Sequence, residues 1–237
     1  DLPLPKNFYT HCHILRGGEK MSKSLGNVID PQELSAKYGP NALRLILLKE
    51  ISAFNDSDLT VERFCKIYNS ELANKLGNLV SRTVAMTQKY FAGKIVPIIQ
   101  LDKDIPISIP DISQYDFNRE KFGRTDLLLQ EIWRLVETAN KYVDDQKPWE
   151  LAKNDNTSKL ETVILNLLET IRLVALLLEL IAPEISQKIL ITLGQDYIDS
   201  SKSQLENSQK YQDLLTWGNL KTNIEIKSIN PLFPRIE

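Results

Sequence analysis

Cysteine and histidine are scarce in this chain of 237 residues, which holds two of each. Cys12 and Cys65 show no paired spacing, which excludes a disulfide scaffold and fits the reducing environment of the cytoplasm. His11 and His13 lie on one face of a predicted strand, but a structural zinc site needs four ligands. We therefore expect a cytoplasmic protein without a metal site.

A strong charge of one sign is also lacking, because 29 lysines and arginines stand against 31 aspartates and glutamates. The formal net charge of -2 gives no global positive field, so any contact with RNA must come from a local patch. The sequence contains no signal peptide, internal repeat or low-complexity tract. Its first residue is Asp1 rather than methionine, so we expect the numbering to start inside a longer protein.

The most apolar run, residues 163–181, is long enough to raise the question of a membrane span. Asn166, Glu169, Arg172 and Glu179 interrupt it, and their spacing lines them up on one stripe of a helix. We therefore predict the central helix of a bundle and no membrane association.

Hydrophobic residues make up 42% of the chain, which is enough for a core. Asp30 and Thr60 are favourable N-cap residues, and the apolar spacing after Thr60 predicts a long helix to about Phe91. A further helix is predicted over residues 115–145. The fold expected is mainly α, an antiparallel bundle of about five helices, with one short strand over residues 6–16.

The stretch richest in chemistry is Gly17–Asn27, which holds three glycines, two lysines and two serines. Glycine allows positive φ, while ammonium groups and hydroxyls donate hydrogen bonds to phosphate oxygens. We interpret this stretch, called the clamp loop below, as a mobile anion clamp. A basic surface loop without a function is the alternative.

Residues 20–24 of the clamp loop read KMSKS, so the chain resembles the class I aminoacyl-tRNA synthetases, which carry this signature. The resemblance implies that Lys23 grips the phosphates of Mg-bound ATP during adenylate formation, with Lys20 as the weaker, positioning partner. A cation that closes on these phosphates late stabilises the transition state more than bound ATP. The other ATP-site residues that the resemblance implies are Ser22, Ser24 and His11.

Later stretches resemble the methionyl-tRNA synthetases in particular. Asn78 and Arg82 match an N-x-x-x-R pattern on a helix that reads the anticodon, and their spacing puts them on one helix face. Trp149 matches a tryptophan that stacks on an anticodon base. Residues 231–237 resemble the segment that ends the catalytic core and folds back toward the signature. By spacing alone, Asn78 and Arg82 fit a solvated helix face, and Trp149 fits a core.

The resemblance extends over residues 4–237 and divides the chain into three parts. Residues 1–55 hold the clamp loop and connecting helices, residues 56–215 form a helical anticodon-binding domain, and residues 216–237 form an extended tail that packs on the KMSKS region. It implies a methionine–tRNA ligase that uses ATP, methionine and the anticodon stem-loop of tRNA(Met). The HIGH signature, methionine pocket and zinc-knuckle cysteines are missing, so we expect the chain alone to be inactive.

Two alternatives remain open. The first is a leucyl, isoleucyl, valyl or cysteinyl synthetase, since these also carry a KMSKS loop followed by a helical domain. The second is a non-catalytic tRNA-binding helical domain that retains the signature. Preferential binding of a CAU anticodon loop would distinguish a methionyl enzyme from the first alternative. RNA binding that survives Asn78→Ala and Trp149→Ala would favour the second.

Overall fold

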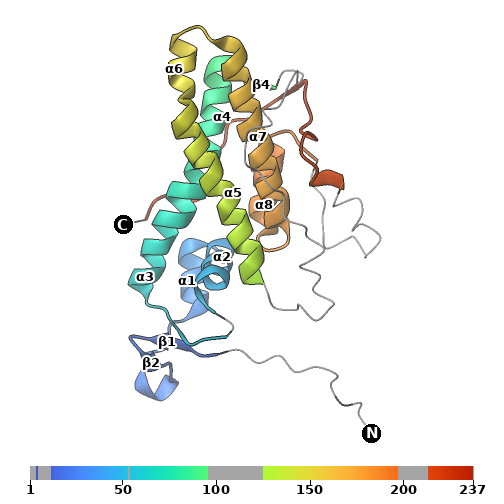
Figure 1. Cartoon of the computed structure of the whole chain (residues 1–237). Helices are drawn as coiled ribbons and strands as arrows, with labels where there is room; N and C mark the ends of the chain where they lie inside the picture. The colour runs from blue at the N-terminus through green and yellow to red at the C-terminus, as the bar shows by residue number, and fades with distance from the viewer. Residues whose placement is uncertain (1–3, 5–11, 53, 96–124, 197–212, 237) are drawn as a thin grey trace.

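The computed structural model describes residues 4, 12–52, 54–95, 125–196 and 213–236, and these are mainly helical (Figure 1). This confirms the predicted fold class. The helices are α1 (Pro31–Tyr38), α2 (Pro40–Glu50), α3 (Val61–Ile67), α4 (Asn78–Phe91), α5 (Thr125–Gln146), α6 (Pro148–Lys153), α7 (Thr157–Glu179) and α8 (Pro183–Thr192), together with the 3-10 turn η1 (Lys23–Leu25) and the π-helical segment η2 (Tyr68–Gly77).

The strands form two small sheets. In the first, β1 (Ile14–Arg16) pairs antiparallel with β2 (Glu19–Lys20) and parallel with β3 (Ser57–Asp58). In the second, β4 (Lys94–Ile95) pairs antiparallel with β5 (Ile224–Glu225). The strand predicted over residues 6–16 is therefore present at its end, while residues 6–11 lie outside the described part of the chain.

Helix starts follow the capping residues that the sequence offers. The Asp30 side chain accepts a hydrogen bond from the backbone N–H of Gln32, and the Thr60 side chain accepts one from the N–H of Arg63. Both confirm the expected N-caps, which satisfy backbone donors that the first helical turn leaves unpaired.

The long helix predicted from Thr60 to Phe91 is present as α3, η2 and α4, but its middle is π-helical. The apolar spacing did not predict this change. A Cβ atom on Gly77 would lie 3.1 Å from the carbonyl oxygen of Leu72, so glycine relieves crowding at the end of the widened segment.

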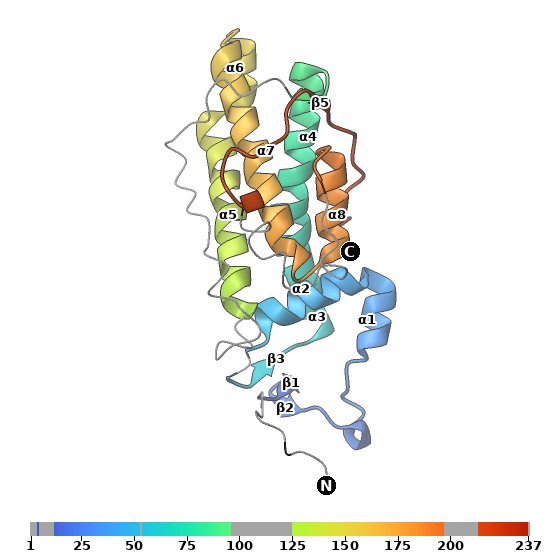
Figure 2. The same cartoon turned by 90° about the vertical axis from the view of Figure 1, so that its right-hand side faces the viewer.

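Helix α7 is the centre of the bundle, as predicted, and contacts α4, α5, α6 and α8 (Figures 1 and 2). All its residues from 163 to 179 are buried, including the polar ones. Among the described residues, no helix is long and apolar enough to cross a membrane.

The C-terminal tail packs along η2. Ile236 exchanges two hydrogen bonds with the side-chain amide of Asn69, and Arg235 Nε donates to Asn74 Oδ1 at 2.9 Å. The Phe233 ring meets the Tyr68 ring edge-on, with centroids 6.0 Å apart. These contacts join the tail to the bundle, while packing of the tail on the KMSKS region and the three-part domain division stay predictions.

Candidate functional site

The clamp loop begins in the hairpin between β1 and β2. Gly17 and Gly18 form the turn with φ of 64° and 81°, a backbone region in which glycine lacks the steric penalty of other residues. The Gly18 N–H points to Asp58 Oδ1 at 3.4 Å, a long contact that links the turn to β3. The start of the loop is therefore held by a three-stranded sheet.

The signature itself is a compact turn that presents cations to solvent. The backbone N–H of Ser22 donates to Asn27 Oδ1 at 2.7 Å, and the hydroxyls of Ser22 and Ser24 are 2.7 Å apart. Lys20 and Lys23 are exposed, and neither forms an ion pair with another described residue. Both ammonium groups are therefore available to an anion, while His11 lies outside the described residues.

Arg82, Trp149 and Asp144 come together at the end of the bundle away from the clamp loop. The guanidinium carbon of Arg82 lies 5.0 Å from the centroid of the Trp149 ring, and Arg82 Nη1 donates to Asp144 Oδ1 at 3.3 Å. Asn78 is exposed one helical turn before Arg82. With Asn78 included, these four residues are called the Arg82 cluster below.

The Arg82 cluster is a surface feature. Trp149 is 40% exposed, which argues against a core tryptophan, and the Arg82 side chain is 33% exposed. A guanidinium beside an indole face is a favourable cation–π arrangement. The cluster therefore offers a planar cation beside an aromatic ring, with an amide one helical turn away on the same face of α4.

Asp144 is the member of this cluster to which the sequence pattern assigned no role. It is 62 residues from Arg82 in the chain, so no local spacing rule connects them. Asn27, whose side chain accepts from the N–H of Ser22, is likewise a clamp-loop residue to which the pattern assigns no role of its own. Both contacts depend on tertiary structure.

The two candidate sites lie toward opposite ends of the molecule. In Figures 1 and 2 the clamp loop, with β1 and β2, is at the bottom, while α6, which carries Trp149, is at the top. Long helices join the two ends, so one elongated ligand would be needed to touch both.

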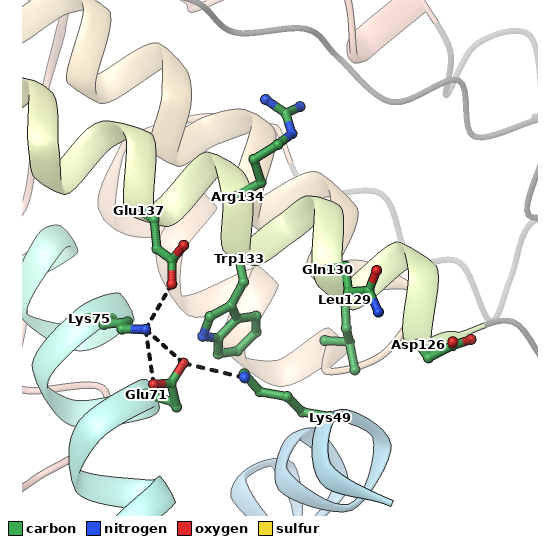
Figure 3. Close-up of a pocket in the computed structure, with 9 residues that line it drawn as sticks. All are labelled: Lys49, Glu71, Lys75, Asp126, Leu129, Gln130, Trp133, Arg134 and Glu137. Atoms are coloured by element: carbon green, nitrogen blue, oxygen red, sulfur yellow. Dashed lines mark hydrogen bonds and ion pairs between the residues drawn. The ribbon is translucent and has the colours of Figure 1, made fainter. Parts of the chain in front are cut away.

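A pocket of about 410 Å³ lies between these ends, where α2, η2 and α5 meet (Figure 3). Lys75 Nζ bridges Glu71 and Glu137 at 3.0 and 2.8 Å, and Lys49 lies 3.5 Å from Glu71. Lys49 also lies 5.6 Å from the ring centroid of Trp133. Because its lysines are paired with carboxylates, this pocket has no excess positive charge for an anion.

Glu71 has a lowered pKa. Burial raises the pKa of its carboxyl, but the hydrogen bond from Lys75 and the charges of Lys49 and Lys75 together bring it below the usual 4.5. A carboxyl of this kind stabilises the fold above its unfolded-state pKa, and this stabilisation disappears as the pH falls through the folded-state pKa.

Glu71→Gln is therefore expected to lower the free energy of unfolding at neutral pH and to have a smaller effect at an acidic pH below the lowered folded-state pKa of Glu71. Urea unfolding of both proteins at the two pH values measures this. Glu19→Gln, which changes an exposed glutamate of β2, is the control. An equal loss at both pH values would contradict the role of the Glu71 charge.

Among the described residues, no group of three or more His, Cys, Asp or Glu side chains is arranged to hold a metal ion.

Comparison with known families gives one match in the N-terminal third of the chain. A family model described as "tRNA synthetases class I (M)" matches residues 1–84, which contain the clamp loop and two of the anticodon candidates, Asn78 and Arg82. The match therefore includes the region in which the KMSKS signature was recognised.

Similar proteins extend the match to the whole chain. Methionine–tRNA ligases of Synechocystis sp. and Clostridium acetobutylicum are 35% and 38% identical over 243 and 245 residues. Each alignment covers 100% of this chain, but 46% and 36% of the relative. The chain thus spans less than half the length of these curated relatives.

Solved structures agree in fold. The methionyl-tRNA synthetase of Mycobacterium tuberculosis in complex with methionyl-adenylate matches 99% of this chain with a TM-score of 0.82 and 28% identity, and the chain covers 45% of that protein. The apo form of the same synthetase gives a TM-score of 0.79 at 24% identity.

Proposed function

Because this chain belongs to the methionyl-tRNA synthetase family, we propose that it supplies two parts of methionine–tRNA ligation: an ATP-phosphate clamp and an anticodon-binding surface. The observation that carries the proposal is the Arg82 cluster, since residues from two distant stretches of sequence meet there. The exposed lysines of the clamp loop support the first part.

In the clamp, Lys23 would contact the phosphates of ATP and follow the charge that develops as pyrophosphate leaves. Such a contact accelerates adenylate formation only if it is stronger in the transition state than with bound ATP. Lys20 would position the nucleotide, and the hydroxyls of Ser22 and Ser24 would donate hydrogen bonds. Mg²⁺ bound to ATP would offset part of the phosphate charge.

In the anticodon site, Trp149 would stack on an unpaired base, which is worth about 1–3 kcal/mol and tolerates any base. Asn78 and Arg82 would address the edge of that base, because an amide offers both donors and acceptors and a guanidinium offers donors. The carboxylate of Asp144, 3.3 Å from Arg82 Nη1, would help to orient these donors beside the ring.

Titration with a short RNA stem-loop tests this assignment. The chain should bind a CAU anticodon loop and lose much of its affinity when the first anticodon base is changed. Trp149→Ala is expected to weaken binding of all loops by about 1–3 kcal/mol, and Asn78→Ala to reduce the difference between the loops.

Gln187→Ala, which removes an exposed amide from α8, is the matched control for Asn78→Ala and should leave both affinities unchanged. Equal, weak binding of both loops by the unmodified chain would contradict the anticodon assignment. Cognate binding that survives both Asn78→Ala and Trp149→Ala would favour a helical RNA-binding domain that reads RNA elsewhere.

We further propose that the chain does not activate methionine by itself, since its 237 residues contain no HIGH signature. A cytoplasmic location stays a prediction from the cysteine content.

A further inference from the structure

We propose that Lys89 and Lys141 contact phosphates of the RNA strand that reaches the Arg82 cluster, one on each side of the cluster. This inference rests on the proposed anticodon function and adds to it two residues that strengthen RNA binding without reading the RNA sequence. Helices α4, α5 and α6 carry the cluster, and the two lysines lie on the exposed faces of α4 and α5.

Lys141 is exposed on the side of α5 that faces the η2–α4 helix. It follows Glu137 by four residues and precedes Asp144 by three, so the three side chains share one side of α5. Glu137 reaches Lys75 on η2 at 2.8 Å, and Asp144 reaches Arg82 on α4 at 3.3 Å. Lys141 therefore lies between two ion pairs that join α5 to the η2–α4 helix.

Lys89 continues the polar face of α4. It follows Arg82 by seven residues and Asn78 by eleven, and these spacings return to the same helix face. Lys89 is exposed, and its Nζ lies 5.3 Å from the ring centroid of Tyr90. It therefore extends the face that carries Asn78 and Arg82 by about two turns.

Several other cations near these helices are already engaged. Lys75 is bonded to Glu71 and Glu137, Arg82 to Asp144, and Lys147 lies 3.4 Å from Glu150. In contrast, neither Lys89 nor Lys141 forms an ion pair with another residue of the described segments. A phosphate can bind these two lysines without breaking an existing ion pair, so contact with them costs less free energy than contact with a paired cation.

The experiment measures stem-loop affinity of the chain as a function of salt. Loss of a phosphate contact reduces the slope of log K against log salt concentration by about 1 and weakens all sequences alike. The Lys89→Ala/Lys141→Ala variant should therefore reduce the magnitude of this slope by about 2, both for the CAU loop and for the loop with a changed first base. The ratio of the affinities for the two loops should stay the same.

Lys188→Ala, which removes an exposed lysine from α8, is the control and should keep the original slope. An unchanged slope in the double variant, with the CAU preference intact in the unmodified protein, would overturn this inference alone. A changed slope without any loop preference in the unmodified protein would support the phosphate contacts and overturn the anticodon assignment. No binding by the unmodified protein would overturn both.

Discussion

Replacing Arg172 with methionine is expected to lower the free energy of unfolding by about 3–5 kcal/mol, because it would leave Glu169 as an uncompensated buried charge. Both residues lie on α7, and their side chains are 3% and 0% exposed. The measurement is urea unfolding followed by circular dichroism, analysed by linear extrapolation. A loss below about 1 kcal/mol would contradict the expected cost of a buried, unpaired carboxylate.

The Glu169–Arg172 pair also holds the chain that returns after α8. Arg172 donates two hydrogen bonds to the Glu169 carboxylate, at 2.6 and 2.7 Å, and two more to the carbonyl oxygens of Leu214 and Thr216. Glu169 accepts from the N–H groups of Gly218 and Asn219. Loss of Arg172 therefore removes contacts with the returning chain as well as the pairing of two charges.

Arg134→Met is the matched control. Arg134 and Glu131 form an ion pair with the same i, i+3 spacing on α5, but their side chains are 35% and 34% exposed. Pairs that water can reach contribute about 0–1 kcal/mol, so this variant should lose far less stability than Arg172→Met. Burial, rather than the presence of an ion pair, is what the comparison measures.

The features predicted correctly from the sequence depend on residues close together in the chain. Asp30 and Thr60 cap helices because a side-chain oxygen reaches N–H groups two or three residues later. The predicted apolar face of α5, which includes Ile132 and Val136, is buried. Such contacts follow from helix geometry alone, so spacing is sufficient to predict them.

The features that the sequence did not reveal depend on distant partners. Asp144 meets Arg82 only after α4 and α5 pack together, and Glu169 finds its backbone donors in a segment some 50 residues away. The π-helical segment is a third case, since its apolar spacing is compatible with an ordinary α-helix. For Asp144 and Glu169, residue type indicates a polar contact, but it does not identify the partner of that contact.

Lys23→Ala is expected to slow adenylate formation by about 100- to 1,000-fold in an enzyme that joins this chain to a complete catalytic domain, with little change in methionine binding. The reason is that the phosphate charge Lys23 would contact grows as pyrophosphate leaves, whereas methionine binds elsewhere. Pyrophosphate exchange measures the rate, and equilibrium titration measures methionine affinity. Equal losses in both would contradict a role confined to the transition state.

Lys20→Ala is the matched control, because it removes the same charge from the same exposed loop. Any effect of the overall electrostatic field should be nearly equal in the two variants, since both lysines are open to solvent and its ions. A much larger rate loss for Lys23→Ala would therefore report a specific position against the phosphates. If the two variants lost activity equally, the clamp loop would act as a diffuse positive patch, and the distinct role proposed for Lys23 would be wrong.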